Sequence, residues 1–261
     1  MRKASVLQIA PPVAVAVILV VAWSLATATV FAGRGYLVPS PFDVAEAFAG
    51  NAGTILGATL TTLQEAFVGY LAAIVVGVAV ASLLSYSRTL ERGLYPYAVL
   101  LQTVPVVAVA PLIVLWFGYG DGSVMIISFI MSLFPIINNT LLGLRSTSHN
   151  LIDLFKLHHA GRLVTLVTLQ LPSALPQTLA GLRISAGLSV IGAIVGEFII
   201  GSGNTRGGLG VQIIFAQGRM FTALLFAEVI AATLLGFCFF LAVSASGDRL
   251  LRNWHESAVS E

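Results

Sequence analysis

Charged side chains are scarce in this chain of 261 residues. Asp, Glu, Lys and Arg make up 9% of it, whereas hydrophobic residues make up 57% and the mean hydropathy is +0.96. A soluble domain has roughly a quarter of its residues charged, so this composition excludes a soluble globular protein and a disordered tail. The net charge of +2 is too small and too scattered for a nucleic-acid-binding surface.

Cysteine is nearly absent as well. The single cysteine, Cys238, excludes an internal disulfide framework and a cysteine metal cluster. Because it lies in an apolar run, residues 236–240, we expect it to be a small buried hydrophobic residue. His158 and His159 are adjacent and would point about 100° apart on a helix, so we expect no metal site there.

Sequence motifs for catalysis and nucleotide binding are also missing. No G-x-x-x-x-G-K-[ST] loop occurs, and the glycine-rich stretch 201–210 lacks the lysine of such a loop. We find no Ser/His/Asp order, no H-E-x-x-H motif and no carboxylate pair that would indicate an active site. We therefore expect a chain that is not an enzyme.

Long uncharged runs fill most of the sequence. Each of five uncharged runs is long enough for a helix of about 20 residues to cross a bilayer core. A sixth run, 174–200, carries Arg183 and Glu197. Continuous apolar runs favour helices over barrel strands, and the first is too long for a signal peptide. We predict an all-α, polytopic membrane protein with about six transmembrane helices, at 11–31, 62–86, 96–117, 124–144, 174–200 and 221–244.

Basic residues predict the orientation of these helices. With the N-terminus inside, predicted external segments hold only Arg34, Arg206 and Arg219. Because cytoplasmic loops carry an excess of Lys and Arg, this distribution predicts that both termini are inside. The nine basic residues on the predicted cytoplasmic side are Arg2, Lys3, Arg88, Arg92, Arg145, Lys156, Arg162, Arg249 and Arg252.

The predicted cytoplasmic loop 145–172 contains a short amphipathic helix. Its apolar face has i, i+3, i+4, i+7 spacing, at Leu151, Leu154, Phe155 and His158. We expect Asn150 to cap this helix, Asp153 to place an acid in its first turn, and the glycine at 160–161 to end it. A second helical stretch then follows and is stopped by Pro172 and Pro176.

This helix has two possible locations. Docking into a groove of a partner protein is one. Lying on the membrane surface is the alternative.

Six short strings occur in order in the sequence: TVPVVAVAPLIVLWFG (103–118), FPIINNT (134–140), LPSALP (171–176), AGLRISAG (180–187), VGEF (195–198) and GGLG (207–210). Together they resemble the permease subunits of bacterial ATP-binding-cassette importers, in the nitrate, sulfonate, taurine and thiamine-precursor branch. The resemblance covers roughly residues 61–254. It implies the type I importer permease fold.

That family carries a cytoplasmic signature, E-A-A, three residues, G, nine residues, I, one residue, L-P. Anchoring it on Leu171 and Pro172 places Leu169 at the isoleucine, His159 at the glycine and residues 153–155 at E-A-A. The two alanines and the glycine are not kept, and we expect Gly161 to supply the turn. The resemblance implies an ATPase-coupling role for Asn150, Leu151, Asp153, Leu154, Phe155, His158, His159, Ala160, Gly161 and Arg162.

The resemblance also implies a multi-subunit assembly in the bacterial inner membrane. A second permease subunit, in a homodimer, would complete the pathway. Two cytoplasmic ATPases would bind ATP and Mg, so no cofactor is expected in this chain, and an external binding protein would deliver a small polar or anionic solute. Within the chain we expect an N-terminal span with an external amphipathic segment (1–60), a permease core (61–254) and a cytoplasmic tail (255–261).

Ionisable groups inside the predicted spans are candidate functional residues, because such groups are costly at membrane depth. Arg183, Glu197 and Glu228 are the ones that we identify. Glu197 either faces a vestibule or pairs with Arg183, but fourteen residues of helix separate the two by about 20 Å, so each needs a different partner. Arg183 and Glu228 have the alternative of snorkelling to the interface.

Polar and aromatic residues add further pathway candidates, although packing or hydrogen bonding between helices is an alternative for each. With Arg183 and Glu197, the pathway candidates are Gln102, Trp116, Phe134, Asn138 and Asn139. The alternative function is an ion-gradient-driven secondary transporter, which would need acid or base relays and inverted repeats.

Overall fold

Helices form all the secondary structure of the described chain. The computed structural model describes residues 6–200 and 207–255, and over these ranges it has eleven α-helices, one π-helical turn and no strand. In order they are α1 (Val6–Thr29), α2 (Pro41–Gly50), α3 (Ala52–Tyr86), α4 (Arg88–Thr103), α5 (Val106–Phe117), α6 (Asp121–Arg145), α7 (His149–Leu157), α8 (Arg162–Thr165), the π-helical turn η1 (Leu166–Gln170), α9 (Leu171–Ile200), α10 (Leu209–Gly218) and α11 (Thr222–His255).

Four helical stretches are long and apolar enough to cross a membrane: Ala52–Tyr86, Asp121–Arg145, Arg162–Ile200 and Thr222–Leu251. Shorter apolar helices add to them at Val13–Thr29, Val106–Phe117 and Leu209–Gly218. The all-α membrane class is therefore confirmed, whereas the number of six crossings stays a prediction.

The third predicted span, 96–117, is not one continuous helix. It is divided into α4 and α5 by a break at Val104 and Pro105. Proline lacks the backbone N–H and disfavours helical geometry in the residue before it, which explains the break. Pro111 and Pro135 lie inside α5 and α6 without ending them.

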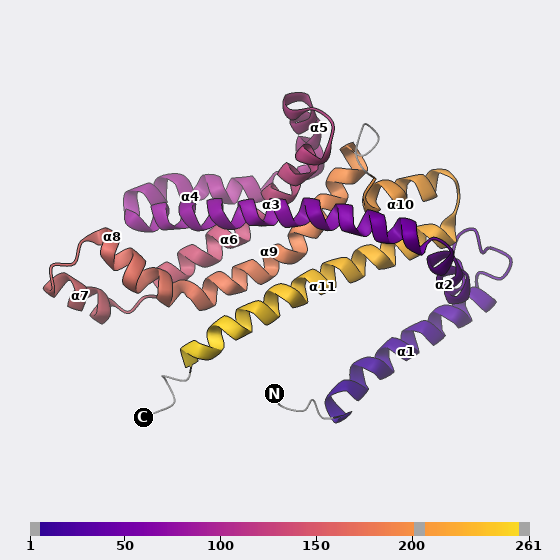
Figure 1. Cartoon of the computed structure of the whole chain (residues 1–261), viewed down its shortest axis with the longest axis horizontal. Coiled ribbons are helices and arrows are strands. Elements are labelled where there is room, and N and C mark those ends of the chain that lie inside the picture. Colours follow the sequence, from indigo (N-terminus) through magenta and orange to yellow (C-terminus); the bar gives the residue numbers. More distant parts are fainter. Residues whose placement is uncertain (1–5, 201–206, 256–261) are drawn as a thin grey trace.

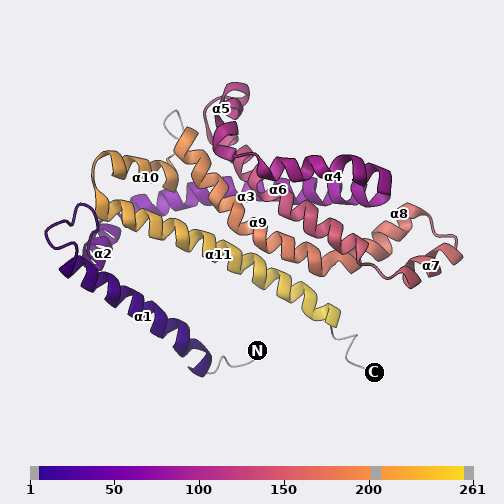
Figure 2. The same cartoon turned by 180° about the vertical axis from the view of Figure 1, so that it is seen from behind.

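The helices form an elongated bundle with two distinct ends (Figures 1 and 2). α7 and α8 lie at one end and α2 lies at the other, with α10 on the same side and α5 projecting near the middle. α1 stands apart from the central helices, and α11 runs alongside α9. The start of α1 and the end of α11 both point toward the end that carries α7. Which side of the membrane this end faces stays a prediction.

Small residues hold the centre of the bundle together, where α6 packs against both α3 and α9. The Ser128 hydroxyl donates to the carbonyl of Ser189 at 2.9 Å, and the Ser185 hydroxyl donates to the carbonyl of Ser132 at 2.7 Å. A Cβ on Gly192 would lie 2.8 Å from Cα of Ser128, so only glycine allows this approach. Close contact through small residues is the usual way in which helices associate without water.

The helix that precedes the fifth predicted span does not stop at Pro172 or Pro176, so that prediction is wrong. Helical structure is continuous from Arg162 to Ile200 and passes through both prolines. The π-helical turn η1 ends two residues before Pro172. Its wider turn changes the hydrogen-bond ladder next to the proline, which lacks an N–H and would crowd an ordinary α-turn.

Cys238 is exposed on α11, so the expectation that it is buried is wrong. An apolar run shows that a helix lies in an apolar environment, but it does not show which residues face the protein. Cys238 lies on the outer face of its helix.

Candidate functional site

Helix α7 presents apolar side chains outward at one end of the bundle. It contains no buried residue, and Leu151, Leu154 and Leu157 are 44%, 46% and 77% exposed. These leucines are three residues apart, so they lie along one side of the helix. Phe155, predicted on the same face, is partly buried instead.

The limits of α7 differ from those predicted. Its N-cap is Ser148, and Asn150 lies within the first turn, so the expectation that Asn150 caps the helix is wrong. The first turn contains no acid, so the expectation for Asp153 is wrong too. The helix ends at Leu157, so the expectation that the glycine at 160–161 ends it is also wrong. His158 is the C-cap, and its N–H donates to the carbonyl of Leu154 at 3.1 Å.

His159, and not Gly161, makes the left-handed turn after α7. Its φ is +53°, whereas Gly161 is extended with a φ of −63°. A residue with a Cβ is disfavoured in the left-handed region by roughly 1–2 kcal/mol, which is why glycine is usual there. His159 is also the residue that aligns with the glycine of the family signature.

The remaining coupling candidates, Asp153, Ala160 and Arg162, lie in and just after α7. Lys156 donates to Asp153 at 2.8 Å, and this hydrogen bond and the positive charge of Lys156 lower the pKa of the Asp153 carboxyl. The Arg162 guanidinium lies 5.4 Å from the centre of the Tyr86 ring, a cation–π contact. Ala160 and Arg162 border a cavity of ≈ 410 Å³ between α7 and the end of α3.

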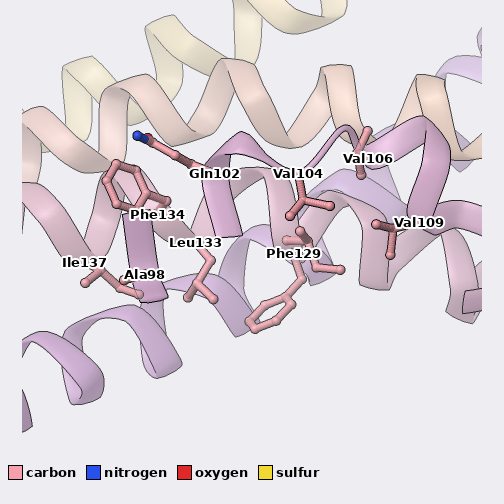
Figure 3. A pocket seen from close by; sticks show the side chains of 10 residues that line it. Ala98, Gln102, Val104, Val106, Val109, Phe129, Leu133, Phe134 and Ile137 are labelled. Atoms are coloured by element: carbon pink, nitrogen blue, oxygen red, sulfur yellow. The ribbon is translucent and has the colours of Figure 1, made fainter. Parts of the chain in front are cut away.

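Gln102 and Phe134 line one cavity beside the break between α4 and α5 (Figure 3). Its volume is ≈ 220 Å³, and Phe129 adds a second ring to its wall. Among the ten side chains drawn, the Gln102 amide is the only polar group. An adjoining cavity of ≈ 200 Å³ shares Gln102 and Phe134 and includes Met131. The structure therefore places two of the predicted pathway residues, Gln102 and Phe134, in the wall of the same cavity.

The other polar and aromatic candidates lie elsewhere. Trp116 is 67% exposed on α5 and does not line this cavity. Asn138 accepts a hydrogen bond from the Tyr95 hydroxyl at 2.7 Å, which joins α6 to α4. Asn139 donates to the carbonyl of Pro135 in its own helix at 2.9 Å. Both asparagines thus have structural partners.

Glu197 is buried and caps a helix, so the expectation that it faces a vestibule is wrong. It is 1% exposed, and its Oε2 accepts from the N–H of Gly210 at 2.5 Å. Its Oε1 accepts from the Thr62 hydroxyl at 2.7 Å, and the oxygen of that hydroxyl accepts from the N–H of Leu209 at 2.9 Å. α10 begins with Gly208 as its N-cap, which has no side chain, so α9 and α3 supply the cap.

Two glycines make room for this cap. A Cβ on Gly208 would overlap the carboxyl of Glu197 and lie 2.7 Å from the Thr62 hydroxyl oxygen. A Cβ on Gly210 would lie 2.6 Å from the carbonyl oxygen of Ile194. The glycines of the GGLG string at 207–210 therefore allow the backbone at the start of α10 to approach the Glu197 carboxylate closely.

The other ionisable candidates have partners or environments of their own. Arg183 donates to Asp248 on α11 at 2.5 Å and has no contact with Glu197, in agreement with the separation expected along the helix. Glu228 is 2% exposed, so it does not snorkel to the interface.

Glu65 was not identified from the sequence, although it lies in the predicted span 62–86. It is fully buried in α3, three residues after Thr62. A single acid at the edge of a long apolar run was the available signal. Residues near the edge of an expected span are readily assigned to its flank, and only the structure places Glu65 beside Glu197.

Comparisons with known proteins agree with the resemblance seen in the sequence. A family model for "Binding-protein-dependent transport system inner membrane component" matches residues 73–253. Two similar proteins are the formylaminopyrimidine transport permease ThiX of Halalkalibacterium halodurans and the riboflavin transport system permease RibX of Chloroflexus aurantiacus. Each is 34% identical, over 89% of this chain and 91% of ThiX, and over 92% of this chain and 88% of RibX.

A solved structure supports the fold. A chain in the inward-facing MetNI methionine ABC transporter superposes with a TM-score of 0.62 and is 20% identical. The match covers 76% of this chain and 95% of that one.

Proposed function

The chain belongs to the family of binding-protein-dependent transport inner membrane components, and we propose that its cargo is a planar, uncharged heteroaromatic solute of the pyrimidine type. As a member of this family it is a multi-pass permease subunit of an ATP-driven ABC importer in the inner membrane. This membership decides against the ion-gradient-driven secondary transporter.

The cavity at Gln102 is the observation that carries the proposed cargo. Its lining contains no charged side chain, and two phenylalanine rings and aliphatic side chains make up most of its wall. Aromatic side chains prefer to stack against other flat rings. The Gln102 amide offers two N–H donors and one carbonyl acceptor, which suits the ring nitrogens and amino groups of a pyrimidine.

A small anion is a poorer occupant of this cavity. Nitrate or a sulfonate would lose its hydration there without meeting a cation, and an unpaired buried charge is very costly. Arg183, the one basic residue of the described part of α9, is held by Asp248 and does not border the cavity. ThiX and RibX, whose names specify a pyrimidine and riboflavin, are 34% identical to this chain and favour the same cargo.

The assembly that we propose follows the family. α7 docks on a cytoplasmic ATPase through Leu151, Leu154 and Leu157, whose exposed positions leave them free for a partner. Apolar residues on one face of a short helix are a common way to fill a groove. Two such ATPases bind ATP and Mg and perform the hydrolysis, a second copy of this chain completes the pathway, and an external binding protein delivers the solute.

Uptake by the complete importer in liposomes tests the cargo. We expect ATP-dependent uptake of a labelled aminopyrimidine, and no comparable uptake of nitrate or an alkyl sulfonate. Gln102→Leu should lower aminopyrimidine uptake by about tenfold, because a buried polar group of the solute loses its partner. Gln64→Leu, at an exposed glutamine of α3 outside the cavity, is the matched control and should leave uptake unchanged.

Preferred uptake of nitrate or a sulfonate would contradict the proposed cargo. Equal losses in Gln102→Leu and Gln64→Leu would show that the cavity does not select the solute.

A further inference from the structure

The carboxyl group of Glu65 has no hydrogen-bond donor although it is completely buried. Its exposed fraction is 0%, and neither of its oxygens accepts a hydrogen bond from an N–H or O–H group of the described residues. The burial of a residue inside one chain cannot decrease when other subunits or lipids pack around that chain. An ionised carboxyl group in this environment is unfavourable by several kcal/mol unless it is paired.

The ionisable groups that act on Glu65 are both acids. Glu197 on α9 lies within hydrogen-bonding range of Glu65, and Asp121 at the start of α6 adds negative charge nearby. α10 has no ionisable residue, and neither Glu228 on α11 nor any cation of the described chain acts on Glu65. Two carboxylates at such short range cannot both stay ionised, so at least one proton lies between them.

The hydrogen bonds decide which acid holds this proton. Glu197 accepts from the N–H of Gly210 and from the Thr62 hydroxyl. It also lies at the N-terminus of α10, where the helix dipole favours negative charge. Hydrogen bonds of this kind stabilise the charged form of a carboxyl group. Glu65 has no such donors, so the proton belongs on Glu65.

We propose that Glu65 is protonated and donates a hydrogen bond to the Glu197 carboxylate, so that the two acids latch α10 against α3 and α9. Loss of this proton would place two negative charges side by side in a dry site. Their repulsion would push the Glu197 carboxylate out of its position at the N-terminus of α10. No group of three His, Cys, Asp or Glu side chains in the described residues could hold a metal ion.

The N-terminal end of α10, which the latch holds, lies in the half of the bundle away from α7 (Figure 1). The latch therefore joins the N-terminus of α10 to two central helices at a point remote from the surface that we assign to the ATPase. The proposal is independent of the cargo, because its tests measure the protonation of a carboxyl group and the hydrogen exchange of α10, and do not measure transport.

Infrared spectroscopy of the purified permease in lipid nanodiscs tests for the proton. We expect the carbonyl-stretch band of a protonated carboxyl group in the wild type at neutral pH, and a loss of intensity in that band in Glu65→Gln. Glu46→Gln, at an exposed glutamate of α2, is the matched control and should not change the band. An unchanged band in Glu65→Gln would overturn the proposal.

Hydrogen exchange of the α10 amides tests the latch. Glu65→Gln keeps a neutral donor, so we expect wild-type protection of Leu209 and Gly210 at neutral pH. Glu65→Leu removes the donor, and protection should fall by about ten- to a hundredfold, the value of a hydrogen bond to a charged group. At alkaline pH, after correction for intrinsic exchange, the wild type should lose protection and Glu65→Gln should keep it.

Two outcomes of that experiment would overturn the proposal. One is the same pH response in the wild type and in Glu65→Gln. The other is protection in Glu65→Leu equal to that of the wild type. A variant that fails to fold is recognised by loss of protection in α6, which lies outside the latch.

Discussion

Gly210→Ala should loosen the cap of α10 by a measurable amount. The added Cβ would lie 2.6 Å from the carbonyl oxygen of Ile194 and 2.7 Å from Cβ of Glu197. Backbone and a Cβ cannot swing aside as the end of a long side chain can, so α10 must shift away from α9. The shift lengthens the hydrogen bond from the N–H of Gly210 to Glu197.

The expected loss of stability can be summed from three effects. Overpacking costs about 1–3 kcal/mol, and weakening a hydrogen bond to a charged group adds roughly 1–2 kcal/mol. Alanine is a better helix former than glycine and returns about 0.5–1 kcal/mol. The net change in the free energy of unfolding is therefore a loss of about 1–4.5 kcal/mol, which lowers the Tm of a chain this size by roughly 2–18 °C.

Thermal unfolding of the permease in nanodiscs, followed by tryptophan fluorescence, measures this change. Gly218→Ala is the matched control, because Gly218 lies at the other end of α10 and a Cβ there meets nothing within 4 Å. We expect its Tm to stay within about 2 °C of the wild type. Equal Tm values for the two variants would refute the reasoning that close approach to Glu197 requires the glycine.

Three further predictions concern the segment around α7. Leu154→Asp should lower ATP hydrolysis stimulated by the binding protein by about tenfold or more, since a charge replaces an interface leucine. Membrane insertion of this variant should stay near that of the wild type, and Leu154→Met, the control, should keep near wild-type ATP hydrolysis. His159→Gly should raise the free energy of unfolding by about 1 kcal/mol and His159→Val should lower it, because only glycine accepts a φ of +53° without strain; equal stability of the two would contradict this reading. Lys156→Ala should raise the pKa of Asp153 toward its ordinary value, measured by carbon NMR of labelled aspartate. In the wild type the Asp153–Lys156 pair therefore stabilises the fold above the ordinary pKa of Asp153. This stabilisation is lost as the pH falls through the lowered pKa of the folded protein. An unchanged Asp153 titration in Lys156→Ala would show that Lys156 does not lower this pKa.

Periodicity and charge predicted the parts of the fold that depend on burial in an apolar medium. The runs 124–144 and 221–244 correspond to α6 and to the apolar part of α11, because a bilayer demands long uncharged helices. The same lack of charge predicted a single span at 96–117, although the helix is broken at Pro105. Local backbone geometry, and not hydropathy, decides such a break.

The site was harder to predict, because its residues come together only through tertiary contacts. Glu197 was found because it stands out in an apolar span, but its partner Thr62 lies 135 positions away. Glu65 was missed at the edge of a span, and Cys238 was placed inside because hydropathy does not distinguish lipid from protein neighbours. The turn after α7 was expected at Gly161, but His159 adopts the left-handed conformation there, which residue type alone did not indicate.

The continuous helix from Arg162 to Ile200 connects the segment beside α7 to the turn that holds Glu197. It has 39 residues and changes direction between α8 and α9 (Figures 1 and 2). α9 alone has 30 residues and is about 45 Å long, so a tilt of about 5° about one end would displace the other by roughly 4 Å. The π-helical turn η1 is the pivot at which such a rod bends most easily, because its hydrogen bonds already depart from the α-helical ladder.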